Sequence, residues 1–158
     1  GLRYDSMRSY YNLSPEKRPL LRHIRIKRGR VIDSISIGYG DRGHAISFGG
    51  DGGVDRGWLK LQPIETLSKV KVCKSRYRRR PLGKIKTVIQ SIKLSIASED
   101  SRNPQFGEMQ GACKTFFRPG KKIVGFHGRA DNYINAIGVI YAPLSEPNIP
   151  FVLDQESL

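Results

Sequence analysis

The chain has 158 residues, of which 38% are hydrophobic and 27% are charged, and it contains 17 Gly and 9 Pro. This length is sufficient for one domain with its own hydrophobic core. Frequent Gly and Pro are typical of many short elements joined by turns. No apolar run approaches the ~18 residues of a membrane-spanning helix, and no secretory leader is visible. The composition therefore indicates one globular domain.

Charge is the most unusual bulk property of the chain. Lys and Arg number 28 against 14 Asp and Glu, which gives a formal net charge of +14. Such a surface attracts polyanions, for example nucleic acid, anionic lipid or sulfated glycan. Alternatively, the basic residues only solvate a β-sheet surface and protect its edges. Charge alone does not distinguish these two interpretations.

The cysteines and histidines give no sign of a metal site. Cys73 and Cys113 lack metal-ligand spacing, and so do the three histidines, His23, His44 and His127. We therefore expect no metal ion or other cofactor. Two isolated thiols fit a reducing compartment, so we expect the cytoplasm or the nucleus, although one disulfide is also compatible with the sequence.

One sequence pattern occurs three times, as VIDSISIGY (31–39), VIQSIKLSI (88–96) and YINAIGVIY (133–141). Each copy follows a shorter β-rich run, and its apolar residues recur with the period of two that predicts a strand. A unit that recurs at spacings of 57 and 45 residues is internal repetition. We therefore predict three equivalent strands whose Ile35, Ile92 and Ile137 meet in a shared core.

The two ends of the chain lack this pattern. Residues 1–20 contain two prolines, so we predict an irregular N-terminal arm with one edge strand near residues 8–13. Residues 144–158 are predicted to be a C-terminal tail outside the repeats. The domain itself is expected to span residues 21–143, in which the one helical candidate, 63–70, is predicted to be a turn followed by a strand.

The repeats favour a closed all-β architecture. Three hairpin-centred sheets related by an approximate threefold axis would pool their Ile and Val faces into one core, as a prism of strands. A β-sandwich remains open, because alternation alone does not distinguish the two arrangements.

The same residues resemble a known family. KIVGFHGRADNYINAIGVIY (122–141) is similar to the last repeat of the jacalin-related plant lectins, and RIKRGRVIDSISIGY with FGGDGG (48–53) is similar to the first. IQSIKLS and FGEMQGACKTFFRPGKKI resemble the family's third quarter. The resemblance implies a β-prism I fold, with three four-stranded antiparallel sheets and pseudo-threefold symmetry. It also implies a carbohydrate-binding domain without catalytic activity.

The resemblance further implies where a sugar would bind. The family's site is typically a G-x-x-x-D loop beside a Gly-rich loop, in which a carboxylate accepts hydrogen bonds from vicinal hydroxyls and backbone N–H groups donate. The first repeat matches this pattern with Gly29, Arg30, Val31 and Asp33. Gly52 lies in the accompanying Gly-rich segment, 49–53. We expect a mannose- or glucose-type glycan here, although Asp33 could equally be a capping residue of a strand.

The last repeat, where the family's principal site usually lies, departs from the pattern. Its loop contains Asp131, Asn132, Tyr133 and Asn135, with Asp131 in place of Gly and Asn135 in place of Asp. An amide oxygen carries no charge, so its hydrogen bonds to sugar hydroxyls should be weaker. The Gly-rich loop that normally precedes the first repeat is absent from the arm. We therefore expect weaker sugar binding here than at Asp33.

The loop of the second repeat is replaced by a basic segment, KSRYRRRPLGKIK (74–86), with seven Lys or Arg and no acid. Arginine clusters bind sulfate and phosphate through paired donors. The candidate polyanion-binding residues are Arg76, Arg78, Arg79 and Arg80. Their ligand would be a sulfated glycan, an anionic lipid or nucleic acid, whereas a solvated hairpin tip is the simpler alternative.

No enzyme is expected. Gly38 to Gly43 fits G-x-G-x-x-G, but a strand rather than a helix follows, so no dinucleotide site forms. No nucleophile or carboxylate pair has a plausible partner in the sequence. Two functions stay open: a plant lectin domain of the mannose type with a role in defence, or an interaction module without sugar binding that engages protein or polyanionic partners. A homodimer or a module of a larger protein is compatible with both.

Overall fold

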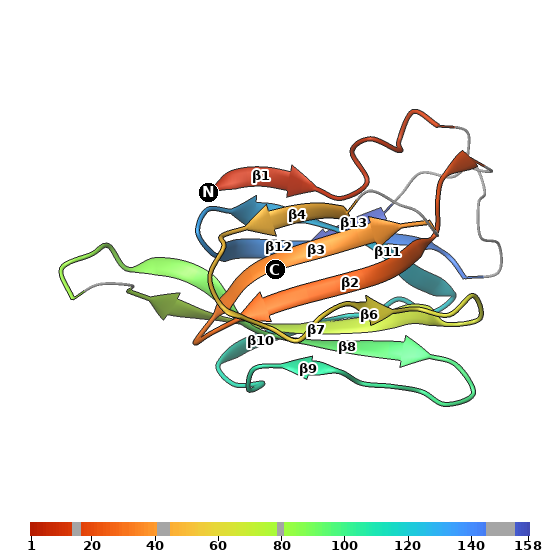
Figure 1. The fold of residues 1–158 in the computed structure, drawn as a ribbon. Coiled ribbons are helices and arrows are strands. Elements are labelled where there is room, and N and C mark those ends of the chain that lie inside the picture. The colour runs from red at the N-terminus through yellow and green to blue at the C-terminus, as the bar shows by residue number, and fades with distance from the viewer. Residues whose placement is uncertain (14–16, 41–44, 79–80, 145–153) are drawn as a thin grey trace.

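The computed structural model describes residues 1–13, 17–40, 45–78, 81–144 and 154–158, and the regular structure of this part is β-sheet (Figure 1). Among these residues, no helix has the length and apolar character needed to cross a membrane. In chain order the strands are β1 (Leu2–Asp5), β2 (Leu21–Arg28), β3 (Ile32–Tyr39), β4 (Ala45–Gly49), β5 (Val54–Asp55), β6 (Leu59–Lys60), β7 (Thr66–Tyr77), β8 (Lys86–Ala97), β9 (Gln105–Phe106), β10 (Ala112–Phe116), β11 (Lys121–Ala130), β12 (Ile134–Pro143) and β13 (Asp154–Ser157).

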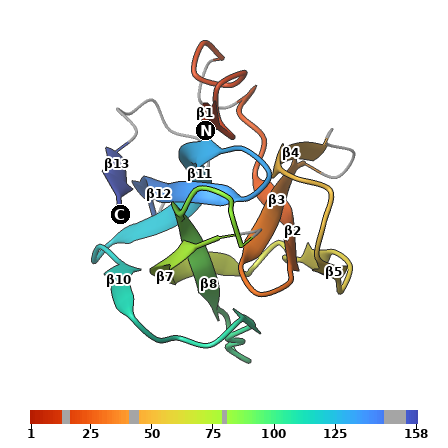
Figure 2. The same cartoon turned by 90° about the vertical axis from the view of Figure 1, so that its left-hand side faces the viewer.

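The strands form three antiparallel sheets, which surround a common centre when the molecule is viewed from one end (Figure 2). Their strand orders are β4-β3-β2-β5, β10-β7-β8-β9 and β1-β11-β12-β13. In the first sheet, β6 also pairs with β2, next to Ile24, whereas β5 pairs at Arg28. β5 and β6 therefore pair with different parts of the same edge of β2 and together form the fourth strand of the first sheet. Each of the three sheets is thus four strands wide.

The predicted threefold equivalence is confirmed. The repeated segments form β3, β8 and β12, one in each sheet, and each pairs with the preceding long strand, β2, β7 or β11. Ile35, Ile92 and Ile137 are 1%, 0% and 0% exposed, and all three belong to one hydrophobic core. Because the three strands lie in separate sheets around one core, the β-sandwich alternative is wrong.

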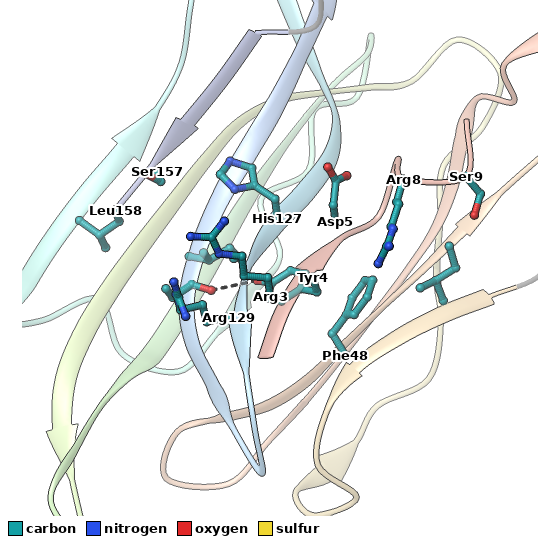
Figure 3. A pocket seen from close by; sticks show the side chains of 14 residues that line it. Arg3, Tyr4, Asp5, Arg8, Ser9, Phe48, His127, Arg129, Ser157 and Leu158 are labelled. Atoms are coloured by element: carbon teal, nitrogen blue, oxygen red, sulfur yellow. Dashed lines mark hydrogen bonds between the residues drawn. The ribbon is translucent and has the colours of Figure 1, made fainter. Parts of the chain in front are cut away.

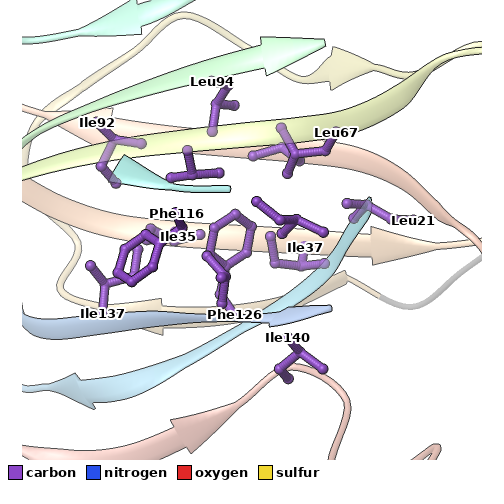
Figure 4. Packing of buried hydrophobic residues seen from close by; sticks show 14 of the residues in the cluster. Leu21, Ile35, Ile37, Leu67, Ile92, Leu94, Phe116, Phe126, Ile137 and Ile140 are labelled. Carbon is purple, nitrogen blue, oxygen red and sulfur yellow. The ribbon is translucent and has the colours of Figure 1, made fainter. Parts of the chain in front are cut away.

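Large aromatic side chains fill the core together with the isoleucines. Phe116 of β10 and Phe126 of β11 are fully buried, and in Figure 4 they lie among the isoleucines of the three sheets. Burial of one such side chain contributes about 1.5–3 kcal/mol. The alternating Ile and Val residues therefore account for both the strands and the way in which the sheets close.

The two ends of the chain are part of the third sheet. β1 pairs with β11, with Leu2 opposite Ala130, and β13 pairs with β12. The edge strand expected near residues 8–13 is therefore placed wrongly, because those residues form turns and the strand is Leu2–Asp5. Four-residue strands are too short to give a clear alternation, and they form because the β11–β12 hairpin offers an unpaired edge on each side.

The cysteines form a disulfide, so the expectation of two free thiols is wrong. Cys113 of β10 lies directly opposite Cys73 of β7, and their sulfur atoms are bonded. The pairing depends on strand register, because the two residues are 40 positions apart in sequence. A disulfide is typical of oxidising compartments, and the cysteines therefore no longer support the cytoplasm or the nucleus.

Candidate functional site

The candidate residues gather at one end of the prism. The β2–β3, β7–β8 and β11–β12 hairpins all turn at this end, where the N-terminus also lies, and the loop after β4 begins there (Figure 1). The β7–β8 hairpin projects furthest. The threefold arrangement therefore brings together the loops that the sequence analysis selected separately.

Asp33 is fixed beneath the loop of the first repeat. The Gly29 N–H donates to Asp33 Oδ1 at 2.8 Å and also lies 3.0 Å from the carbonyl of Val31. Gly29 and Arg30 are exposed, whereas Val31 is buried and Asp33 is only 7% exposed. The Asp33 carboxylate thus holds the β2–β3 turn closed. Because Asp33 lies at the start of β3, its side chain stays at this end of the prism.

The Gly-rich segment 49–53 packs directly on Asp33, as predicted. The Gly50 N–H donates to the Asp33 carbonyl at 3.0 Å. A Cβ added to Gly52 would lie 2.9 Å from Asp33 Oδ2, and one added to Gly53, whose φ is +89°, would lie 2.7 Å from Oδ1. Any side chain at these positions would collide with the carboxylate. The two loops therefore form a close glycine-lined cradle around one acid.

The loop of the last repeat is engaged by the basic hairpin. Lys86 Nζ lies 2.6 Å from Asp131 Oδ2, and the Tyr133 N–H donates to Asp131 Oδ1 at 3.1 Å. Burial is the largest single influence and opposes ionisation of Asp131. The hydrogen bonds from Lys86, Tyr133 and Asn135 and the charge of Lys86 together outweigh it and hold the pKa of this carboxyl below its usual range. Asp131, which replaces the family's Gly, therefore acts as an anchor for Lys86.

Further contacts cover the same loop. The rings of Tyr77 and Tyr133 meet edge to face with centroids 5.3 Å apart, and the Asn135 side chain donates to the Thr87 carbonyl at 3.5 Å. Gly1 lies so close to Asn135 that a side chain there would collide with it. The side-chain amide oxygen of Asn135, Oδ1, is buried and has no hydrogen-bond partner among the described residues. The oxygen that stands in place of the family's carboxylate is therefore covered.

Asn132 connects the two candidate loops. Its carbonyl lies against Gly50, where an added Cβ would again collide. The sequence analysis selected Asn132 as a sugar-binding residue, but it did not predict that Asn132 packs against Gly50. It also did not predict the contacts made by Gly1, Tyr77 and Lys86. No sequence signal pointed to them, because each contact joins different repeats.

The basic hairpin is only partly within the described residues. Arg76 and Arg78 are exposed, and the Arg78 guanidinium donates to the Pro81 carbonyl at 2.8 Å. Arg79 and Arg80 lie outside the described residues. Polyanion binding by these four arginines stays a prediction.

Comparison with known proteins agrees with the geometry of the fold. The family model of the jacalin-like lectin domain matches residues 5–140. Jacalin-related lectin 3 from Arabidopsis thaliana is 31% identical over 82% of this chain, and Jacalin-related lectin 11 from the same plant is 45% identical over 30% of it. The chain spans 21% of the first relative and 11% of the second.

Solved structures give the same result. Malaysian banana lectin has a TM-score of 0.70 at 25% identity, covering 90% of this chain and 91% of its own. A mannose-binding jacalin-related lectin from Ananas comosus has a TM-score of 0.63 at 25% identity, with 79% and 84% covered. A mannose-specific lectin from Morus nigra, solved with mannose, has a TM-score of 0.63 at 25% identity, with 78% and 80% covered.

These likenesses identify the three-sheet arrangement as the β-prism I fold. They also agree with the expectation that the chain is not an enzyme, since the family consists of lectins. On the family match across most of its length, the chain belongs to the jacalin-like lectin domain family.

Proposed function

We propose that this chain is a non-catalytic carbohydrate-binding domain for mannose- or glucose-type glycans, and that Asp33 receives the sugar. The observation that supports this most directly is the cradle in which Gly29 fixes the Asp33 carboxylate beside the exposed glycines 52 and 53. A fixed carboxylate is suited to two vicinal hydroxyls, and glycine backbone N–H groups are suited to sugar oxygens.

The burial of Asp33 limits what the site would do. Because the side chain is only 7% exposed, a sugar hydroxyl would reach one edge of the carboxylate, between Gly29 and the 49–53 loop. Few hydrogen bonds would form, and millimolar affinity, about −4 kcal/mol, would be ordinary for such a site. Tight binding would then require several copies of the domain on one ligand.

The last repeat is the weaker candidate. Its acid is replaced by Asn135, whose oxygen is buried near Gly1, and its Asp131 is paired with Lys86. Asn132 and Tyr133 are held by the neighbouring loop and hairpin.

The mannose-binding relatives from Ananas comosus and Morus nigra support a mannose-type ligand for the domain.

A calorimetric titration with methyl α-mannoside tests this proposal. Asp33→Asn keeps the acceptor for Gly29 but removes the charge, so we expect affinity to fall about ten- to a hundredfold. Gly52→Ala should also reduce binding, because its Cβ would push on Asp33 Oδ2. Asp51→Asn, an exposed acid in the same loop, is the matched control. Wild-type affinity in both Asp33→Asn and Gly52→Ala would refute the site.

One observation favours a second function. The contacts that cover the last-repeat loop are those expected of a module that has lost its principal sugar site and presents the basic hairpin instead. Such a domain would engage a polyanionic or protein partner through Arg76 and Arg78. The greater length of the curated relatives fits a module within a larger polypeptide. Absence of binding to any neutral sugar, together with salt-sensitive retention on heparin that is lost in the double variant Arg76→Gln, Arg78→Gln, would favour this alternative.

A further inference from the structure

A groove of about 630 Å³ runs along β1, between β4 on one side and the outer face of β11 and β12 on the other. It contains no residue of the loops 29–33, 49–53 or 131–135. Figure 3 shows Arg3 and Arg129 on one side of Tyr4, and Arg8 on the other side, extending toward Phe48. Three guanidinium groups therefore line a groove whose size is typical of ligand pockets.

Two of the three arginines form a like-charged pair across neighbouring strands. Arg3 of β1 lies directly opposite Arg129 of β11 in the antiparallel register. Like charges in this position repel and destabilise the strand pair. Within the part of the chain that the structure describes, the side chains of Arg3, Arg8 and Arg129 make no ion pair and no hydrogen bond. An anion between them would remove the repulsion.

The one acid side chain among the groove residues that the structure describes balances only one of the three arginine charges. Asp5 accepts a hydrogen bond from the Met7 N–H at Oδ1 and another from the Tyr11 hydroxyl at Oδ2, both at 2.8 Å. Its carboxylate thus holds the turn that follows β1. Among the described lining residues no other carboxylate side chain is present, so the groove has an excess of positive charge.

The remaining lining suits a sugar ring better than a bare ion. Phe48 stacks on Tyr4 with ring centroids 4.5 Å apart, and the Tyr4 hydroxyl donates to the Ala136 carbonyl at 3.1 Å, so this wall is rigid. Ser9 and Ser157, both exposed, also line the groove and lie toward its two ends (Figure 3). An apolar wall with a few polar groups is typical of small-ligand pockets.

We propose that this groove binds a sulfated glycan, with the sulfate group held between Arg3 and Arg129 and a sugar ring beside Phe48. The planar guanidinium group presents paired donors that match a tetrahedral oxyanion. A nucleic acid would need a basic track with open aromatic faces for its bases. Here three guanidinium groups line one groove, and Phe48, an aromatic side chain of this groove, is already stacked on Tyr4.

The test is a calorimetric titration with a heparin tetrasaccharide and its desulfated form, at low and at high salt. The wild-type protein should bind the sulfated form alone, and more weakly at high salt. The double variant Arg3→Gln, Arg129→Gln should lose affinity about tenfold or more. The double variant Arg56→Gln, Lys60→Gln removes the same charge from exposed positions outside both the groove and the basic hairpin, and it should bind within about twofold of wild type.

Three outcomes would overturn the proposal. The first is equal binding of the desulfated fragment. The second is a loss of affinity in the Arg56→Gln, Lys60→Gln variant as large as in the groove variant. The third is tighter, equally arginine-dependent binding of a single-stranded oligonucleotide, which would make the groove a nucleic-acid site. If the double variant does not fold, Arg8→Gln on the opposite wall provides the same comparison, with a loss of affinity expected and wild-type affinity counting against the site.

Discussion

Lys86 and Asp131 are 45 residues apart in sequence, yet Lys86 Nζ lies 2.6 Å from Asp131 Oδ2. This ion pair joins the loop that replaces the second repeat's turn to the loop of the last repeat. With the contact between Tyr77 and Tyr133, it makes the basic hairpin a cover for the position that the family's principal site occupies. The departure from G-x-x-x-D in the last repeat therefore has a structural role.

We predict that Lys86→Ala will loosen the hairpin without unfolding the domain. The Lys86 side chain is about half exposed, and exposed ion pairs contribute about 0–1 kcal/mol. The midpoint of urea unfolding should therefore change little. Hydrogen exchange of the β7–β8 hairpin amides should become faster, because an anchor of the hairpin is lost. Lys84→Ala, at an exposed position of the same hairpin, is the control, and equal exchange rates in the two variants would contradict the anchoring role.

We predict that the disulfide makes a large contribution to stability. It connects the edge strand β10 to β7 across 40 residues, and a loop of this length contributes about 4 kcal/mol in the chain-entropy model. Replacing both Cys73 and Cys113 by Ala should lower the free energy of unfolding in urea by an amount of this order. A thiol assay on the unfolded, unreduced protein should find no reactive thiol. Detection of two thiols there would contradict the disulfide.

Much of the fold could be predicted because the information is local and repeated. VIDSISIGY, VIQSIKLSI and YINAIGVIY each place an isoleucine at the same point of an alternating strand, and Ile35, Ile92 and Ile137 do meet in the core. The pairing of Asp33 with the 49–53 loop was also predictable, because both segments match a known motif. In each case every segment can be recognised by itself from a short local pattern.

What could not be predicted depends on register and on contacts between repeats. Opposition of Cys73 and Cys113 requires knowledge of how β7 and β10 pair. The strands at the two ends exist only because the β11–β12 hairpin leaves its edges unpaired. The covering of Asn135 by Gly1 likewise joins the first residue to the last repeat. Composition and alternation contain none of these relationships.

We predict that Ser6→Ala will destabilise the domain by about 1–3 kcal/mol, because it leaves the buried Phe126 N–H without its partner. Ser6 is completely buried, its hydroxyl accepts a hydrogen bond from the Phe126 N–H at 2.9 Å, and it lies 2.8 Å from the Tyr39 hydroxyl. It thus ties the N-terminal arm to two sheets. Ser101→Ala, at an exposed position, is the control for urea unfolding. Equal midpoints in the two variants would mean that the arm adds no stability.

We predict that the domain loses stability in mild acid partly through His127. Burial lowers the pKa of this imidazole below 6.5, and nearby Asp5 only partly opposes the effect. The unfolded chain therefore binds a proton more readily than the folded chain. Stability from neutral His127 is fully present above the unfolded pKa of about 6.5 and is lost as the pH falls below it. His127→Gln should flatten the dependence of the melting temperature on pH between neutral and mildly acidic solution. An identical pH profile for wild type and His127→Gln would show that the buried imidazole does not control acid stability.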